Sequence, residues 1–284
     1  NIGDRLIAQS LANRYQHYYK VIRCSFEGSL DIWSEDSYQY GVKDEIKRLY
    51  GKCISVIRTI SPQKRKKEVA LDQTVMSEIE QCDFVCIGGG NMLMYDYYCM
   101  FESYLEYAIA HGKKVFAVDV GVGPFSTEQE LINTCKCLDK CQCVTFRDKS
   151  SLELAKKYCT NERMFLAIDP CFFVYRDKME CVNKKEKEFV AINIMDLSLD
   201  FASKEMEYNL LNVYEILIEE MVKVTEKKIV LYSTVYEDYH IIRKLAKRLF
   251  RKDINIGIKT VYSIKDLDDL YQKTCYVVAM RMHA

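Results

Sequence analysis

Short apolar segments alternate along the chain with longer segments whose apolar residues recur every three or four positions. The short segments are rich in β-branched residues and predict buried strands, whereas the longer ones predict amphipathic helices. Strands are expected at residues 20–26, 83–87, 114–120, 143–146, 165–168, 189–194, 228–232, 258–261 and 276–280. Helices are expected at residues 5–17, 101–111, 128–138, 151–158, 205–225 and 238–250. This alternation predicts an α/β protein with parallel sheets that helices cover on both faces.

A charged stretch without periodicity, residues 177–187, separates two groups of predicted elements. We therefore expect an N-terminal Rossmann-like domain at 1–178, a linker at 179–188 and a C-terminal Rossmann-like domain at 189–284. The second domain is expected to be incomplete, because the chain ends shortly after its last predicted strand. Ligands of open α/β sheets bind beyond the carboxyl ends of the strands. The cleft between two such domains is therefore the expected site.

The charge balance narrows the classes of ligand. Lysine plus arginine and aspartate plus glutamate each total 41, which gives a formal net charge of zero. Without a basic field the chain is not expected to bind nucleic acid, and any bound anion must be held by local groups. No apolar run is long enough to predict a transmembrane helix, which leaves peripheral association with a membrane open. The first residue is Asn1, so the natural start of the protein is expected to be missing.

The 13 cysteines lie mostly in apolar segments. This distribution predicts reduced thiols packed in the core of a cytoplasmic protein rather than a disulfide framework. One group consists of Cys135, Cys137, Cys141 and Cys143, and its spacing differs from the Cys-x2-Cys pairs typical of zinc sites. The segment is also expected to run from a helix into a strand, which would point the thiols in different directions. No metal site is expected.

Glycines gather at the ends of predicted strands. Gly88, Gly89 and Gly90 follow one strand, Gly121 and Gly123 follow the next, and Gly3 precedes the first predicted helix. Glycine permits positive φ angles and a close approach of other atoms to the backbone, whose N–H groups can then hold an anion or a hydroxyl. A tight turn without a ligand explains any single one of these turns, but their recurrence favours a bound ligand.

Two polar residues flank these turns. Asn91 follows the triple glycine and is expected to bond a sugar hydroxyl or to occupy the turn, and Asp4 lies beside Gly3. The turns match neither the dinucleotide fingerprint nor the P-loop, so binding of NAD or a Walker-type nucleotide is disfavoured.

Cationic side chains are expected at two strand exits. Arg281 and His283 follow the last strand, and strand alternation would put them on the same side. A fixed cation beside an imidazole suits an anionic substrate whose reaction moves a proton. Arg147 follows the strand at 143–146; because Ser150 and Glu153 have capping-box spacing, Arg147 is expected to be free for a carboxylate or phosphate. The plainer alternative is an ordinary arginine at a strand end and a structural histidine.

These residues together resemble the polysaccharide pyruvyl transferases, over essentially the whole chain. The resemblance is carried by Asn1-Ile2-Gly3-Asp4, Gly88-Gly89-Gly90, Gly121-Val122-Gly123-Pro124, Arg147-Asp148 followed by Ser151, Asp169 after an apolar strand, and Arg281-Met282-His283. It implies an architecture similar to GT-B glycosyltransferases. It also implies transfer of pyruvate from phosphoenolpyruvate to two sugar hydroxyls as a cyclic ketal, in capsule, exopolysaccharide or cell-wall polysaccharide synthesis.

On this resemblance, Arg147 and Arg281 are expected to converge on the anionic groups of the donor, and His283 to act as general acid or base. The glycine turns and Asn91 would position the donor or the acceptor, a sugar or a lipid-linked oligosaccharide. No cofactor is expected. Two other functions stay open: a glycosyltransferase that uses a nucleotide-sugar donor, and a carbohydrate- or anion-binding module without turnover.

Overall fold

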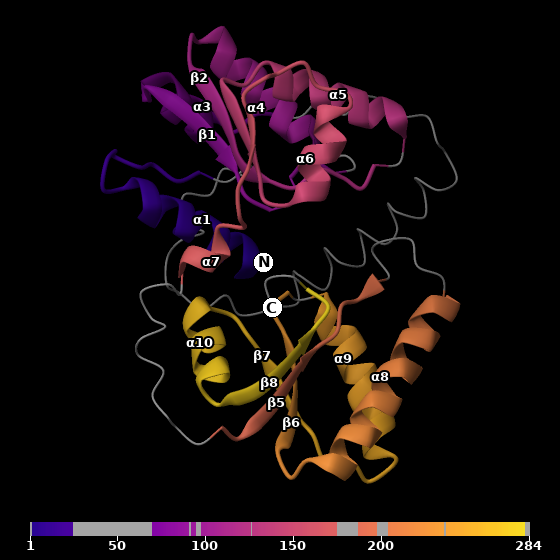
Figure 1. The fold of residues 1–284 in the computed structure, drawn as a ribbon. Helices are drawn as coiled ribbons and strands as arrows, with labels where there is room; N and C mark the ends of the chain where they lie inside the picture. The colour runs from indigo at the N-terminus through magenta and orange to yellow at the C-terminus, as the bar shows by residue number, and fades with distance from the viewer. Residues whose placement is uncertain are drawn as a thin grey trace. The chain divides into compact units, whose positions relative to one another are not determined.

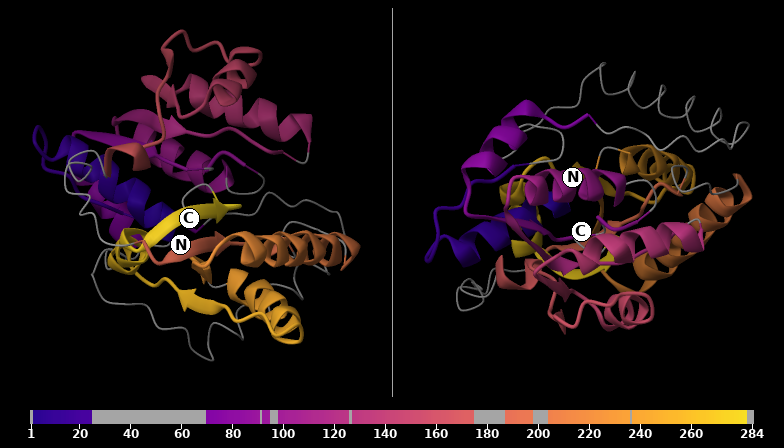
Figure 2. Two further views of the ribbon diagram at one scale, coloured as in Figure 1. Left: turned by 60° about the horizontal axis from the view of Figure 1, so that its bottom comes forward. Right: turned by 90° about the horizontal axis from the view of Figure 1, so that it is seen from above.

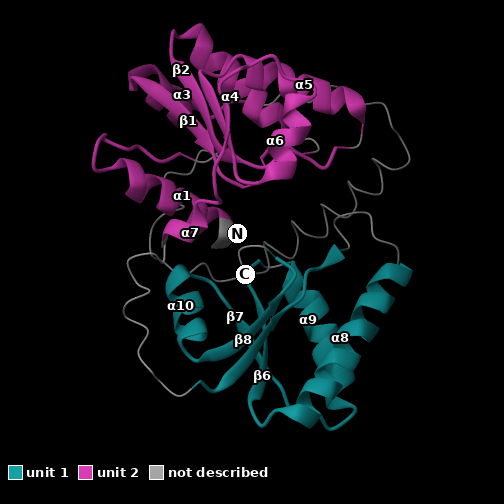
Figure 3. Cartoon of the chain, in the orientation of Figure 1, with its two compact units in different colours: residues 1–3, 35–63, 181–284 teal, residues 4–34, 64–180 magenta. Residues whose placement is uncertain are grey.

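Two parallel four-stranded sheets form the framework of the structure, and they confirm the predicted α/β class (Figure 1). The structure is a computed structural model that describes residues 2–24, 70–90, 92–94, 98–125, 127–174, 187–197, 204–235 and 237–281. From residue 4 onward these residues divide into two compact units, magenta and teal in Figure 3. The N-terminal unit holds the described residues of 4–174, and the C-terminal unit those of 187–281. Most of the predicted linker, 179–186, lies outside the described residues.

The sheet of the N-terminal unit has the strand order β1-β2-β3-β4, and all neighbours are parallel. Its strands are β1 Phe84–Gly88, β2 Lys114–Val120, β3 Cys143–Phe146 and β4 Met164–Leu166. The carboxyl ends of the strands therefore lie along one edge of the sheet. Near that edge the pairing of β2 with β3 shifts between Ala117 and Val120, so that β2 contains one extra residue. Such a β-bulge changes the direction of a side chain and is frequent beside functional sites.

The helices of this unit bury apolar faces against the sheet. They are α3 Gln73–Gln81, α4 Tyr98–Ala110, α5 Glu128–Asp139 and α6 Lys149–Lys156, with α1 Ile2–Tyr15 at the start of the chain and the short α7 Cys171–Val174 at the end of the unit. Phe101 of α4, Leu138 of α5 and Phe146 of β3 belong to one core and are fully buried. The start of α5 is fixed by a capping box between Thr127 and Glu130.

The sheet of the C-terminal unit has the strand order β7-β6-β5-β8. Its strands are β5 Phe189–Asn193, β6 Lys228–Ser233, β7 Gly257–Thr260 and β8 Thr274–Ala279. The helices α8 Lys204–Val224 and α9 Asp238–Phe250 pack side by side, and α10 Ile264–Gln272 joins β7 to β8 (Figures 1 and 2). The two central strands are almost continuously buried, as expected for a parallel sheet covered on both faces.

Most predicted elements lie within a few residues of their expected bounds, but one predicted strand is wrong in its described part. Residues 20–24 of the predicted strand at 20–26 are irregular, and Val21 and Ile22 are exposed. A short apolar run does not by itself decide whether a segment joins a sheet. The helices α3, α7 and α10 were not predicted. For α10 a signal existed, because Ser263 and Asp266 form a capping box at its start.

Candidate functional site

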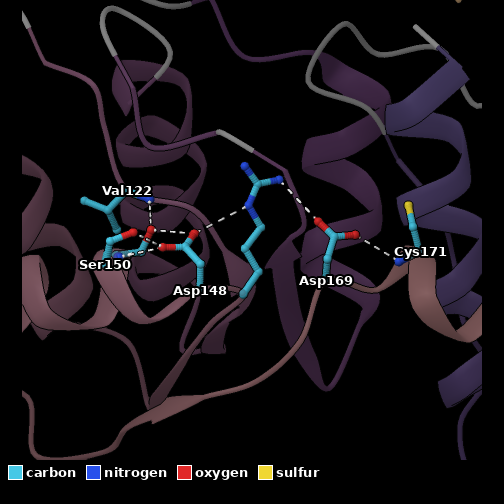
Figure 4. Close-up of polar contacts among 7 residues, drawn as sticks. Val122, Asp148, Ser150, Asp169 and Cys171 are labelled. Carbon is cyan, nitrogen blue, oxygen red and sulfur yellow. Dashed lines mark hydrogen bonds and ion pairs between the residues drawn. The ribbon is translucent and has the colours of Figure 1, made fainter. Parts of the chain in front are cut away.

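Arg147 lies at the carboxyl edge of the N-terminal sheet, directly after β3, and is held by two carboxylates (Figure 4). Its Nη1 donates to Oδ2 of Asp169 over 3.3 Å, and its Nε lies 3.8 Å from Oδ2 of Asp148. The Arg147 side chain is 9% exposed and that of Asp169 is 2% exposed. Arg147 is therefore not an unpaired cation, because two residues that follow strand exits already pair with it; its contact with a donor stays a prediction.

Asp148 connects this arginine to the second glycine turn, which contains Gly121 and Gly123 and follows β2. The Oδ1 of Asp148 accepts from the backbone N–H of Ser151, which makes Asp148 the N-cap of α6, so the expected cap at Ser150 is wrong. The Ser151 hydroxyl donates to Oδ2 of Asp148 and accepts from the Val122 N–H, a relay drawn in Figure 4. Burial acts to raise the pKa of Asp148, but hydrogen bonds from Ser150 and Ser151 and the charge of Arg147 outweigh it and lower this pKa. The carboxylate is thus ionised beside the guanidinium.

The two glycine turns are hydrogen-bonded to each other rather than open. Gly121 N–H donates to the Gly90 carbonyl over 3.0 Å, and Gly123 N–H donates to the Leu93 carbonyl over 2.7 Å. Gly89 N–H donates to the Val118 carbonyl. These amides therefore pair within the protein instead of pointing to a ligand. The assignment of Gly88, Gly89, Gly90, Gly121 and Gly123 to substrate binding stays a prediction.

Gly89 allows helix α1 to contact the end of β1 directly. Its φ is +79°, and a Cβ at this position would lie 1.8 Å from Cγ2 of Ile7. A Cβ on Gly90 would lie 3.9 Å from Oδ1 of Asp4, so the Asp4 carboxylate sits at this turn, in the first turn of α1. Gly3 lies inside α1, which begins at Ile2, so the prediction that Gly3 precedes the first helix is wrong.

The β-bulge of β2 places Asp119 in the left-handed region, with a φ of +52°. Non-glycine residues rarely adopt this conformation, which is often associated with function. The Thr145 hydroxyl accepts from the Asp119 N–H and donates to Asp119 Oδ1, both over 2.7 Å, while Oδ2 lies 3.8 Å from Nη1 of Arg14. The side chain is 2% exposed, and this burial raises the pKa of Asp119. From the sequence alone, an acid at this strand end is as readily structural as functional.

In the C-terminal unit, Arg281 makes a bidentate pair with Asp238. Arg281 Nε donates to Asp238 Oδ2 over 2.5 Å and Nη2 donates to Oδ1 over 2.7 Å. Asp238 lies in the first turn of α9 and is fully buried, whereas the Arg281 side chain is 24% exposed. Burial raises the pKa of Asp238, although the Arg281 charge opposes this. The sequence pattern indicates Asp238 only as the first residue of a predicted helix.

The end of β8 differs from its prediction. The strand ends at Ala279, where Met280 N–H donates to the Asn193 carbonyl and Arg281 N–H donates to the Asn193 side-chain oxygen, each over 3.3 Å. Because the Asn193 side chain replaces the next ladder contact, strand alternation does not extend to Arg281. The predicted site residues Asn91 and His283 lie outside the described residues, so their roles stay predictions.

The described ranges contain neither clustered metal ligands nor a membrane-spanning helix. Within them, no group of three or more histidine, cysteine, aspartate or glutamate side chains is arranged to hold a metal ion. Every cysteine placed by the structure is a free thiol, and Cys135, Cys137 and Cys141 are buried. None of the helices that the structure describes is both long and apolar enough to cross a bilayer.

These observations define a class: an α/β protein with two parallel sheets, in which an arginine at a strand exit of each unit pairs with a buried aspartate. Open α/β sheets bind their ligands beyond the carboxyl ends of the strands, where these arginines lie. The chain belongs to the polysaccharide pyruvyl transferase family, whose model matches residues 1–284, the whole chain. This match confirms the resemblance found in the sequence. No curated protein matches the chain significantly.

Proposed function

We propose that this protein transfers pyruvate from phosphoenolpyruvate to two hydroxyls of a sugar, as a cyclic ketal, during capsule, exopolysaccharide or cell-wall polysaccharide synthesis. The observation that carries the proposal is membership of the family over the entire chain. The position of Arg147 and Arg281 at the exits of strands of their sheets supports it. The proposed acceptor is a sugar or a lipid-linked oligosaccharide.

The reaction joins two hydroxyl oxygens to C2 of phosphoenolpyruvate, protonates C3 to a methyl group and breaks the bond between C2 and the phosphate oxygen. Of the two protons that the hydroxyls lose, one balances the new methyl group and the other leaves with inorganic phosphate. The enzyme must therefore hold a carboxylate and a phosphate and move protons between oxygen and carbon. No external oxidant, reductant or cofactor is needed for this balance.

In this proposal Arg147 and Arg281, each considered within its own unit, are the residues proposed to bind an anionic group of the donor. Each guanidinium has a fixed direction, because Asp169 and Asp148 hold the first and Asp238 holds the second. A guanidinium in a fixed direction recognises a carboxylate or phosphate by its planar geometry. The aspartates offset the positive charge of the arginines. Recognition of phosphoenolpyruvate would therefore depend on the orientation of the guanidinium N–H groups more than on a local excess of positive charge.

His283 is the proposed proton carrier, because an imidazole titrates near neutral pH and can both accept and deliver a proton. Asp4 and the glycine turns are proposed to lie on the acceptor side, where the exposed Asp4 carboxylate could accept hydrogen bonds from sugar hydroxyls. We also propose a cytoplasmic location, which the free thiols and the reducing environment of that compartment support.

The test is phosphate release from phosphoenolpyruvate, measured against a panel of sugar acceptors. The proposal predicts release that depends on both the protein and one acceptor class. Thermal stabilisation of the protein by a nucleotide sugar, with no release of phosphate from phosphoenolpyruvate, would instead support a glycosyltransferase. Stabilisation by a sugar or an anion without any turnover would support a binding module.

A further inference from the structure

Asp238 is the most deeply buried charged group at the carboxyl edge of the C-terminal sheet. Its side chain is 0% exposed, and its two oxygens accept three hydrogen bonds: two from Arg281 and one from the backbone N–H of Asp196, over 2.9 Å. The Asp196 amide belongs to the segment that follows β5. Asp238 thus joins the start of α9 to the exits of β5 and β8.

We propose that Asp238 is a positioning residue that fixes the direction of the Arg281 guanidinium for binding of the phosphoenolpyruvate donor. This inference rests on the proposed function. It adds a residue that the sequence pattern did not indicate and assigns it a role that differs from helix capping.

The geometry of the pair supports this role. An arginine side chain has many rotamers, and fixing them costs conformational free energy at the moment a ligand binds. Arg281 is fixed at both ends before any ligand arrives: its backbone N–H donates to Asn193, and its Nε and Nη2 donate to Asp238. A bidentate carboxylate contact sets the plane of the guanidinium as well as its position. The remaining exposed part, 24% of the side chain, therefore has one orientation.

Asp238 lies at the start of a helix but does not cap it, which distinguishes positioning of Arg281 from the usual role of an aspartate at this place. Asp and Ser side chains near helix starts usually accept hydrogen bonds from the helix's own first turn. The N-cap of α9 is Glu237, which makes no side-chain cap bond, and the Asp238 oxygens bond to Arg281 and Asp196 instead. Burying a carboxylate is expensive unless it is paired, so the acid at this position is explained by the arginine it holds.

The experiment compares Asp238→Asn with the wild type and with Glu215→Gln as a matched control. Asparagine keeps the shape and one acceptor oxygen, but it cannot form the charged bidentate pair. Glu215 is also a largely buried carboxylate paired with cations, Arg248 and Lys252, but Arg248 lies ten residues further along α9 from Asp238. At 1.5 Å per residue, this is roughly 15 Å along the helix.

We expect Asp238→Asn to raise KM for phosphoenolpyruvate about tenfold or more, with a smaller change in kcat and no change in KM for the acceptor. Glu215→Gln should leave all three constants unchanged. In an Arg281→Ala background, Asp238→Asn should have no further effect on KM, because the two residues act through one contact. A purely structural Asp238 would lower the melting temperature in both backgrounds and leave KM for the donor unchanged.

A second variant changes Arg281 and leaves Asp238 as it is. Arg281→Lys retains the positive charge but cannot bond to both carboxylate oxygens with a planar fork. If direction is what matters, this variant should lose donor affinity nearly as strongly as Arg281→Ala. Wild-type donor affinity in Arg281→Lys, or a wild-type KM in a folded Asp238→Asn, would overturn the inference. An absence of phosphoenolpyruvate turnover in the wild type would instead overturn the proposed function.

Discussion

Arg147 donates to Asp169 across 3.3 Å, which ties the residue after β3 to a residue that follows β4. Both side chains are almost completely buried, and Asp169 also accepts from the backbone N–H of Cys171 at the start of α7. The carboxyl edge of the N-terminal sheet therefore contains an ion pair that holds the loops after β3 and β4. Arg147, which is proposed to bind the donor, is thus also part of the internal structure of the unit.

We predict that Asp169→Asn destabilises the protein by about 3 kcal/mol, because it leaves the buried Arg147 charge with a weaker partner. Denaturant unfolding of the variant would measure this change. Glu153→Gln is the control, since the Lys149–Glu153 pair is exposed and i,i+4 spaced and should contribute no more than about 0.5 kcal/mol. Equal effects of the two substitutions would show that the Arg147–Asp169 pair is energetically unimportant.

Asp119 gives a pH-dependent prediction. Its pKa in the folded protein is raised by burial, so the folded form holds its proton at pH values where an unfolded aspartate has lost it. This contribution to stability is complete below the ordinary aspartate pKa of about 3.9 and is lost as the pH rises through the raised folded value. Asp119→Asn, which stays neutral and tolerates the left-handed backbone, should gain in melting temperature relative to the wild type as the pH rises toward neutrality. If the difference in melting temperature between Asp119→Asn and the wild type did not change with pH, Asp119 would not be a buried carboxyl that titrates.

Gly89→Ala should destabilise the protein strongly, by about 3 kcal/mol, because the new Cβ would overlap Ile7 at a φ of +79°. Gly112→Ala is the matched control: its φ is +71°, but nothing lies within 4 Å of the added Cβ. The control should lose only about 1 kcal/mol, the cost of the backbone conformation. Adding Ile7→Ala should recover part of the loss in Gly89→Ala and none in Gly112→Ala. Similar losses in both glycine variants would mean that α1 does not pack on the first glycine turn.

His283→Ala should reduce turnover by about a hundredfold or more while donor binding is largely kept, since general acid–base groups contribute on this scale. Steady-state turnover and calorimetric titration with phosphoenolpyruvate would separate the two effects. Unchanged turnover would remove His283 from the mechanism.

Several features of the fold could be predicted from the sequence. The strands β2 and β3 and the helix α9 have the bounds expected from hydrophobic periodicity, because each is a long or well-delimited apolar pattern. Residues 20–24 carry a similar short apolar run but are irregular, since pairing in a sheet depends on distant residues that a local pattern does not contain. Helix α3 is not indicated by the sequence pattern although the shorter α6 is, so helix length alone does not decide what periodicity can predict.

The candidate site was predictable in one respect and not in another. Arginines at strand exits can be found from sequence, because an apolar run that ends in a cation is a local pattern. Their partners cannot be found so easily: Asp169 lies 22 residues from Arg147 and Asp238 lies 43 residues from Arg281. The bulge that turns Asp119 inward likewise depends on register with β3, which only the folded sheet defines.

Mass spectrometry of an acceptor sugar incubated with the protein and phosphoenolpyruvate, with released phosphate measured in parallel, distinguishes pyruvyl transfer from the alternatives. We predict a product heavier than the acceptor by one pyruvic acid less one water, with one phosphate released for each product molecule. A sugar that stays unmodified across acceptor classes, or one that gains a glycosyl group from a nucleotide sugar instead, would contradict it.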